Sequence, residues 1–320
     1  MYKNSSIAVI LPAFNEAATI EASILEFHQH LPEAKIYIID NCSNDGTGII
    51  ARKALEKFAV EGFVINERRK GKGNALRTAF LTIDADIYLM SDADMTYPAN
   101  LARDLISPIL NREADMVVGD RHFDGQYGRE NKRLFHEFGN SLVRFLINLF
   151  FRAKLSDVMS GYRAFSKDFV KTYPILVSGF QVETEMTLHA LDKRFRIQEI
   201  PVGYKNRKEG SVSKLNTYKD GLKVLIVIIK ILRYYRPLLF FTALASFFSI
   251  LGLIASIPVF TDWIEYRYIY HIPLAIFATG MEIFALMLFG IGLILDSLGY
   301  YHRMEFECLR LEKSNVNVKG

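Results

Sequence analysis

Two long stretches with almost no charge constrain the fold of this chain most strongly. Residues 237–260 contain no charged side chain, and residues 272–295 contain one, Glu282. An α-helix rises 1.5 Å per residue, so each stretch can cross a hydrocarbon layer about 30 Å thick. The alternative is a buried helical hairpin, but stretches this apolar rarely fit inside a domain of this size. The sequence therefore predicts two transmembrane helices, with Glu282 facing the other span, a neighbouring subunit or a partner, or tolerated in its protonated form.

The residues that flank these spans predict their orientation. The link 261–271 is rich in aromatic side chains, which favour the headgroup layer, and its only lysine or arginine is Arg267. Basic residues gather instead outside the two spans, at Lys230, Arg233, Arg236, His302, Arg303 and Arg310. By the positive-inside rule, both ends of the chain then lie in the cytoplasm. We expect a multi-pass protein of the cell (inner) membrane with its large N-terminal domain in the cytoplasm.

The N-terminal part alternates short apolar runs with helical patterns. The runs that predict strands cover residues 7–11, 35–39, 62–65, 87–90 and 115–118. Helical spacing of apolar residues lies between them, over residues 15–28, 47–58 and 74–83. Strands that alternate with helices indicate βαβ units, and therefore an α/β fold with a mostly parallel sheet.

Beyond residue 120 the pattern becomes less regular. It predicts a helix over 131–151, a short strand over 161–165, a helix over 181–192 and a strand over 197–204. A polar, basic loop follows, and after it residues 216–236 interleave apolar and basic side chains as an interfacial helix does. The expected organisation is an α/β domain (1–215), an amphipathic interfacial helix (216–236), a two-helix transmembrane region (237–295) and a cytoplasmic tail (296–320).

Composition removes several other classes of protein. The net charge of +4 gives no reason to expect a nucleic-acid partner. The chain has only two cysteines, Cys42 and Cys308, which cannot form the disulfide framework of a small secreted protein. The first apolar run is too short for a signal peptide and is typical of a strand.

Two aspartates follow the strand predicted over residues 87–90. Asp92 and Asp94 are two positions apart at the strand end, where both carboxylates can face one ligand. Hard cations such as Mg²⁺ prefer oxygen ligands and bridge phosphates readily. Such a cation neutralises the charge that grows on a diphosphate leaving group. Two aspartates on a loop are more often solvated or capping residues, so the pair depends on its context.

That context is a series of motifs at strand ends. PAFNE (12–16) follows the first strand, DNCSNDGT (40–47) follows the second, GKGNAL (71–76) comes next, and then DAD (92–94). Ligands of such sheets bind beyond the carboxyl ends of the strands. VVGDR (117–121), SGYRAF (160–165) and YKNRKEGSVSK (204–214) continue the series. The chain resembles the family 2 glycosyltransferases of GT-A fold over roughly residues 7–215. Within that family it is similar to the dolichyl-phosphate mannose synthase and polyprenyl-phosphate glycosyltransferase branch, whose membrane-anchored members carry paired spans.

The resemblance implies a donor site for a nucleotide-activated sugar and a divalent metal, Mg²⁺ or Mn²⁺. The residues it places at the donor nucleotide are Pro12, Asn15, Glu16, Asp40, Asn41, Gly71, Lys72, Asp92 and Arg207. It places the metal on Asp94 and, in a position where the branch has glutamine, Thr96. Family members often have an aspartate where Asn41 stands, so the choice between GDP- and UDP-linked sugars stays open. Asp40 also suits a turn or cap, and Lys72 a solvated surface charge.

The resemblance also implies a polyprenyl or dolichyl phosphate as acceptor. A lipid phosphate is already anionic, so it requires cationic groups to hold it rather than a strong general base. The matching acceptor residues are Arg121, Lys132, Arg133, His136 and Lys214, and the catalytic set is Asp92, Asp94 and Arg121. Direct displacement with inversion at the anomeric carbon is the outcome implied. Arg207 and Lys214 also suit attraction to anionic lipid.

Several questions stay open at the level of sequence. Arg163 fits a structural role as well as a functional one. Glu183 and Glu185 are two apart on a predicted helix, so at most one is expected to reach the site. A processive polysaccharide synthase normally carries a Q-x-x-R-W motif, which is absent here because the single tryptophan is Trp263. A membrane glycosyltransferase with another acceptor, and a non-catalytic scaffold that binds nucleotide sugars, are the alternatives. A homo-oligomer is compatible with the spans.

Overall fold

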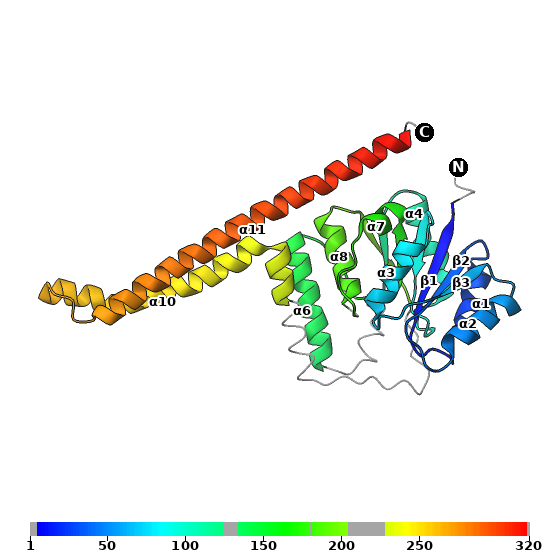
Figure 1. Ribbon diagram of the computed structural model, residues 1–320, viewed down its shortest axis with the longest axis horizontal. Helices are drawn as coiled ribbons and strands as arrows, with labels where there is room; N and C mark the ends of the chain where they lie inside the picture. Colours follow the sequence, from blue (N-terminus) through cyan, green and yellow to red (C-terminus); the bar gives the residue numbers. More distant parts are fainter. Residues whose placement is uncertain (1–4, 124–133, 180, 204–227, 319–320) are drawn as a thin grey trace. The chain divides into compact units, whose positions relative to one another are not determined.

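The structure is a computed structural model that describes residues 5–123, 134–179, 181–203 and 228–318. For residues 134–138 and 313–318 it describes the backbone alone. The chain divides into two compact units, Met1–Gly221 and Leu222–Gly320. Figure 1 shows a sheet covered by helices in the first unit and two long helices in the second.

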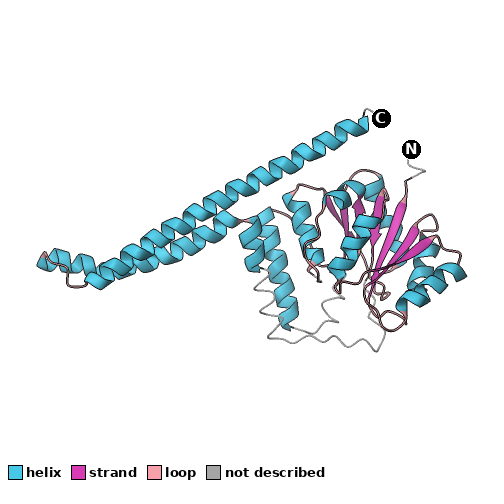
Figure 2. Cartoon of the chain, viewed as in Figure 1, coloured by secondary structure: helices cyan, strands magenta, loops and turns pink. Residues whose placement is uncertain are grey.

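The first unit is built on one seven-stranded sheet with the order β3-β2-β1-β4-β6-β5-β7 (Figure 2). β6 runs antiparallel to its neighbours β4 and β5, and the other neighbouring pairs are parallel. This confirms the α/β class with a mostly parallel sheet. The strands are β1 (Ile7–Ala13), β2 (Lys35–Asp40), β3 (Gly62–Asn66), β4 (Ile87–Met90), β5 (Met116–Asp120), β6 (Arg163–Ser166) and β7 (Ile197–Pro201).

The reversed direction of β6 decides which loops meet. Met90 and Val118, near the carboxyl ends of β4 and β5, both lie opposite Arg163, the first residue of β6. The amino end of β6 therefore lies at the same edge as the carboxyl ends of the parallel strands. As a result, the segment 156–162 that leads into β6 joins the edge where sheets of this kind bind ligands.

Helices cover both faces of this sheet. One face holds α1, α2 and α4, whose apolar side chains join those of β1 and β2 in the main core. On the other face α3 and α7 pack against each other and against the sheet, through an aromatic cluster that includes Phe80, Phe165 and Phe169. The helices are α1 (Ile20–His30), α2 (Thr47–Lys57), α3 (Lys72–Thr82), the 3₁₀ turn η1 (Ala99–Leu101), α4 (Ala102–Leu110), α6 (Leu134–Phe151), α7 (Lys167–Thr172) and α8 (Val182–Asp192).

The structure corrects two parts of the predicted pattern. The first helix begins at Ile20, whereas the sequence suggested residue 15. Asn15 has a left-handed backbone with φ of 57°, which cannot continue a right-handed helix. The helices α4 and α7 were not predicted. Pro108 lies inside α4, and α7 has only six residues, so neither carries a long helical signal.

The second unit is a helical hairpin of α10 (Pro237–Tyr266) and α11 (Ile272–Val318). Both helices are long and apolar enough to cross a membrane. α10 continues through most of the predicted link, and α11 continues through the segment expected to be a separate tail, because charged residues do not interrupt a solvated helix. Of the predicted interfacial helix, 216–227 lie outside the described residues, and 228–235 are helical.

Glu282 faces the other helix of this hairpin. The hydroxyl of Ser249 donates a hydrogen bond of 2.8 Å to its Oε2. A Cβ on Gly252 would lie 2.8 Å from Oε1 of Glu282, so glycine provides the space for the carboxyl group. Phe248 packs edge-on against Phe284 beside this contact. Of the positions considered for Glu282, the structure therefore shows the one against the other span.

Candidate active site at the carboxyl edge of the sheet

Three strands at the carboxyl edge are followed by residues in a strained conformation. Asn15 follows β1, Cys42 follows β2 and Met95 follows β4, with φ of 57°, 64° and 61°. Left-handed backbone is uncommon for residues other than glycine and tends to cluster at functional sites. Asn15 and Cys42 lie within motifs that the sequence singled out, and Met95 directly follows the motif DAD (92–94).

The loops after β1 and β2 are bound to each other by hydrogen bonds. The backbone N–H of Asn15 donates to Oγ of Ser43 at 3.0 Å, and the Asn15 side chain accepts from the N–H of Asn44 at 3.0 Å. The N–H of Glu16 donates to Oγ1 of Thr47 at 2.9 Å. The polar side chains of the two motifs thus bind the two loops together. Pro12, near the end of β1, and Asp40, the last residue of β2, are held in a fixed relation to each other.

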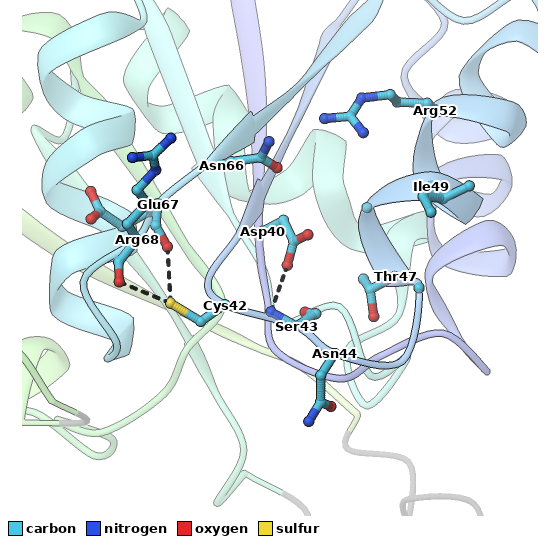
Figure 3. Close-up of a pocket in the computed structure, with 12 residues that line it drawn as sticks. Asp40, Cys42, Ser43, Asn44, Thr47, Ile49, Arg52, Asn66, Glu67 and Arg68 are labelled. Atoms are coloured by element: carbon cyan, nitrogen blue, oxygen red, sulfur yellow. Dashed lines mark hydrogen bonds between the residues drawn. The ribbon is translucent and has the colours of Figure 1, made fainter.

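An open pocket of about 630 Å³ lies at the ends of β2 and β3 (Figure 3). Asp40 forms part of its wall and accepts a hydrogen bond of 3.1 Å from the N–H of Ser43. A Cβ on Gly48 would lie 2.5 Å from the Asp40 carboxylate, so this glycine lets Asp40 lie against the start of α2. The pocket is lined by Asp40, Cys42, Ser43, Asn44, Gly46, Thr47, Gly48, Ile49, Arg52, Asn66, Glu67 and Arg68.

Asn41 ties this pocket to the loop after β3. Its amide nitrogen donates to the carbonyl oxygens of Glu67 (3.3 Å) and Arg69 (2.7 Å), and its amide oxygen accepts from the N–H of Gly71 at 2.6 Å. The residue is only 4% exposed. An aspartate could not donate these bonds, so the structure gives a physical reason for asparagine here.

Glu67 is a pocket residue that sequence analysis missed. Its carboxylate accepts from the backbone and guanidinium of Arg69 and from the hydroxyl of Thr78. The guanidinium of Arg69 and the hydroxyl of Thr78 outweigh burial and lower the pKa of Glu67 to about 2. The carboxylate therefore stays charged and holds the loop in place.

Gly71 and Gly73 are required by a close approach of the chain. Gly71 has φ of 127°, and a Cβ there would lie 2.0 Å from the carbonyl oxygen of Ser178. A Cβ on Gly73 would lie 2.0 Å from the carbonyl oxygen of Val177. In this structure the glycines thus accommodate residues 177–178 at the beginning of α3.

Lys72 joins two acidic residues from different parts of the chain. Its ammonium contacts Asp92 and lies 2.6 Å from Oε1 of Glu183, on α8. Its side chain is only 8% exposed, which excludes the solvated surface charge considered from sequence. Burial disfavours the ammonium, but the two carboxylates outweigh it and raise the pKa of Lys72. A Cβ on Gly161 would lie 2.7 Å from the carboxylate of Asp92. The segment that leads into β6 therefore packs closely against Asp92.

Asp94 is oriented by its own loop. The backbone N–H and hydroxyl of Thr96 donate to its Oδ1 at 3.2 and 2.6 Å. Thr96 is 1% exposed, so here its hydroxyl orients Asp94. Among the residues that the structure describes there is no group of three His, Cys, Asp or Glu that could hold a metal by itself. Mg²⁺ is commonly held by one or two carboxylates together with substrate phosphates. The single oriented carboxylate of Asp94 fits a cation that takes its other ligands from phosphate and water.

Arg121 follows β5 and is clamped by Asp157. Its Nε lies 2.6 Å from Oδ2 of Asp157, and its Nη2 lies 3.0 Å from Oδ1. Both side chains are at least nine-tenths buried. Burial raises the pKa of Asp157, but the Arg121 guanidinium outweighs burial and keeps this pKa below its usual value. Asp157 was not predicted, although it lies just before the SGYRAF motif.

Arg163 has a structural role. It is fully buried, and its guanidinium donates to the carbonyl oxygens of Ser160 (2.8 Å) and Val158 (2.9 Å) and to the hydroxyl of Thr187 (2.9 Å). These bonds fix the turn that carries Asp157. The remaining predicted acceptor and loop residues, Lys132, Arg133, Arg207, Lys214 and the side chain of His136, lie outside the described residues.

A mostly parallel sheet that brings a polar pocket, an aspartate pair and a clamped arginine to one edge is the arrangement of the GT-A glycosyltransferase class. The model described as Glycosyl transferase family 2 matches residues 8–173. The chain therefore belongs to glycosyl transferase family 2 and is a glycosyltransferase.

Two curated relatives extend this result. Glycosyltransferase AglJ of Haloferax volcanii is 27% identical over 94% of this chain and 96% of its own length. Polyprenol monophosphomannose synthase of Mycolicibacterium smegmatis is 25% identical over 65% of this chain and 80% of its own length. The predicted resemblance to the polyprenyl-phosphate branch is thus confirmed at the level of homologues.

A solved structure supports the fold. Glucosyl-3-phosphoglycerate synthase from Mycobacterium tuberculosis, in complex with Mn²⁺, UDP and its product, superposes with a TM-score of 0.56. It is 22% identical, over 72% of this chain and 79% of that chain. The likeness confirms the GT-A fold.

Proposed function

We propose that this chain transfers a hexose from a GDP- or UDP-linked donor to a polyprenyl or dolichyl phosphate, with inversion, at the cytoplasmic face of the membrane. The observation that carries the proposal is the meeting of Asp92, Asp94 and Arg121 at one edge of the sheet. β4, β6 and β5 are neighbours, and the aspartates and Arg121 follow the first and last of them. The proposed donor-binding and acceptor-binding groups therefore follow two strands, β4 and β5, that are separated only by β6.

The donor nucleotide is assigned to the pocket beside Asp40. Asp40 accepts hydrogen bonds from the base or ribose, while Pro12, Asn15 and Glu16 form the neighbouring wall. Asn41 and Gly71 shape that wall through the bond between them. Lys72 holds Asp92 toward the sugar and ribose. Arg207 is the further donor residue of the proposal.

Asp94 is the residue that would hold Mg²⁺ or Mn²⁺, with Thr96 beside it. Such a cation supplies Lewis-acid stabilisation of the leaving diphosphate. Support comes from the fixed orientation of the Asp94 carboxylate by Thr96. It also comes from a fold neighbour whose structure contains Mn²⁺ and UDP.

Arg121 holds the acceptor phosphate in line with the anomeric carbon in this proposal, with Lys132, Arg133, His136 and Lys214 as further cationic or donor groups. A guanidinium binds phosphate through paired N–H donors. The phosphate oxygen is itself the nucleophile, so no side chain has to remove a proton from it.

The C-terminal unit is proposed to keep the enzyme in the membrane where the lipid acceptor is found. α10 and α11 anchor the chain in the bilayer that contains a polyprenyl phosphate, and both termini lie in the cytoplasm. A C-terminal reporter is expected to be labelled only after the membrane is permeabilised. Labelling of intact cells from outside would contradict the orientation while leaving the chemistry untouched.

The experiment that tests the proposal is a donor screen. The full chain in liposomes with a polyprenyl phosphate is incubated with radiolabelled UDP- and GDP-sugars and Mg²⁺ or Mn²⁺. A lipid-linked hexose from one donor is the expected result. Metal-dependent hydrolysis without a lipid product would indicate a different acceptor. Neither transfer nor hydrolysis with any donor would favour a scaffold that binds nucleotide sugars without catalysis.

A further inference from the structure

The turn that holds Asp157 is itself held by a carboxylate on the far edge strand. Glu199 lies on β7, and its two oxygens accept from the backbone N–H of Ser156 at 2.8 and 2.9 Å. Oε1 also accepts from the N–H of Asp157 at 2.8 Å. Val118 of β5 lies directly opposite Glu199, so the carboxylate projects near the strand end that carries Arg121.

The same turn is also held by α6. Nη1 of Arg144 donates to the carbonyl oxygen of Ser156 at 3.0 Å. Asn148 exchanges two hydrogen bonds with the backbone of Leu155, at 2.9 and 3.0 Å. Three consecutive residues, 155–157, are thus fixed by a strand and a helix.

We propose that Glu199 is a positioning residue which, through the backbone of Ser156 and Asp157, sets the Arg121 guanidinium for the acceptor phosphate. The inference rests on the function proposed above for Arg121. Charge-assisted hydrogen bonds from backbone N–H groups to the Glu199 carboxylate hold the backbone of Ser156 and Asp157, and therefore fix the position from which the Asp157 side chain extends. Asp157 then transmits that direction through its paired contacts with Nε and Nη2 of Arg121.

The chemistry of this arrangement explains why the residue is a glutamate. A glutamine would offer one acceptor oxygen and would turn an NH₂ group toward the Ser156 N–H. The turn would lose at least one charge-assisted bond and gain freedom to rotate. We expect the loss to weaken binding that depends on Arg121 by roughly tenfold, which corresponds to about 1.4 kcal/mol.

A matched ion pair at the opposite end of β5 provides the control. Asp115, just before β5, binds Arg196 through two contacts of 3.0 Å. It resembles the Arg121–Asp157 pair in chemistry, but it joins the starts of β5 and β7 and so lies at the edge away from the site. Asp115→Asn and Glu199→Gln should both lower the unfolding temperature by a few degrees.

The test measures KM separately for acceptor and donor. Glu199→Gln and Asp157→Asn are expected to raise the acceptor KM by roughly tenfold with the donor KM within twofold, whereas Asp115→Asn leaves both unchanged. In an Arg121→Ala background, Glu199→Gln should add nothing to the acceptor KM. An equal rise of both KM values, or an additional rise without Arg121, would overturn the proposal in favour of a general structural role.

A binding measurement separates this inference from the proposed function. Titration of a short polyprenyl phosphate into the full chain in detergent reports acceptor affinity without turnover. If the polyprenyl phosphate binds Glu199→Gln more weakly than the unmodified chain, the inference is supported even if neither protein transfers a sugar. If the unmodified chain transfers sugar while Glu199→Gln binds and uses the acceptor equally well, the inference fails and the function stands.

Discussion

The ammonium group of Lys72 lies 2.6 Å from a carboxylate oxygen of Glu183, and it contacts Asp92 as well. Lys72 begins α3, Glu183 lies on α8 and Asp92 follows β4, so one buried cation connects three elements of the first unit. The side chains of Lys72 and Glu183 are 8% and 6% exposed. The part of the site proposed to bind the donor therefore contains a lysine balanced by two carboxylates.

Lys72→Met is predicted to destabilise the chain strongly. It leaves the buried carboxylate of Glu183 and the partly exposed carboxylate of Asp92 without their shared cation. Breaking a buried pair such as Lys72–Glu183 in this way costs about 3 kcal/mol or more. Thermal unfolding in detergent measures the loss. Lys167→Met removes an exposed pair with Asp84, 2.9 Å apart, and should cost less than about 1 kcal/mol. Similar losses for the two variants would contradict the importance of burial.

Asn41→Asp is predicted to loosen the loop after β3. The substitution removes the donor to the carbonyl oxygens of Glu67 and Arg69 and places a charge beside them. We expect a loss of about 1–3 kcal/mol in stability and a higher donor KM. Asn44→Asp is the stability control, because Asn44 is exposed and bonds to Asn15 through its backbone N–H. Equal stability of Asn41→Asp and the unmodified chain would refute the role assigned to the amide.

The Glu67 carboxylate is predicted to make stability depend on acid pH. Arg69 and Thr78 lower its folded-state pKa to about 2, below the value in the unfolded chain. Its contribution is therefore complete above the usual glutamate pKa and is lost as pH falls toward about 2. Between pH 5 and 2, roughly, Glu67→Gln should lose less stability than the unmodified chain. Parallel unfolding-temperature curves for the two proteins would contradict this assignment.

Gly252→Ala is predicted to disturb the membrane hairpin. The added Cβ would lie 2.8 Å from Oε1 of Glu282, closer than such contacts allow. The bond between Ser249 and Glu282 should be displaced, with a loss of about 1–3 kcal/mol. Gly280→Ala is the matched control, since a Cβ there meets nothing within 4 Å. If both variants unfold at the same temperature in detergent, the close packing at Gly252 is refuted.

Sequence alone predicted the strands and the edge because both signals are local. Apolar runs end at Pro12, Asp40 and Asp92, and parallel strands bring such ends together. The direction of β6 was not predictable in the same way, because the sequence of its four residues does not indicate which strands it pairs with or in which direction it runs. Its antiparallel pairing with β4 and β5 is what brings Asp157 to the site.

The partners of the predicted residues were hidden for a related reason. Lys72, Arg121 and Asn41 were selected from motifs, but Asp157 and the carbonyl of Arg69, which bind two of them, come from other elements. Glu183 was considered for the site, but its ion pair with Lys72 was not predicted. Long-range pairing of this kind leaves no periodic pattern. Glu199 belonged to a predicted strand, where only the fold reveals that its carboxylate meets residues 156–157.

The central claim is tested most directly by sugar transfer in the unmodified chain and in Asp94→Ala, each with Mg²⁺ or with a chelator. With the donor found in the screen and a polyprenyl phosphate, the unmodified chain should form a lipid-linked hexose only when metal is present. Asp94→Ala should fold and insert normally yet lose at least about a hundredfold in rate, because several kcal/mol of charge stabilisation depend on that carboxylate. Undiminished transfer by Asp94→Ala, or full activity of the unmodified chain in the chelator, would contradict the account.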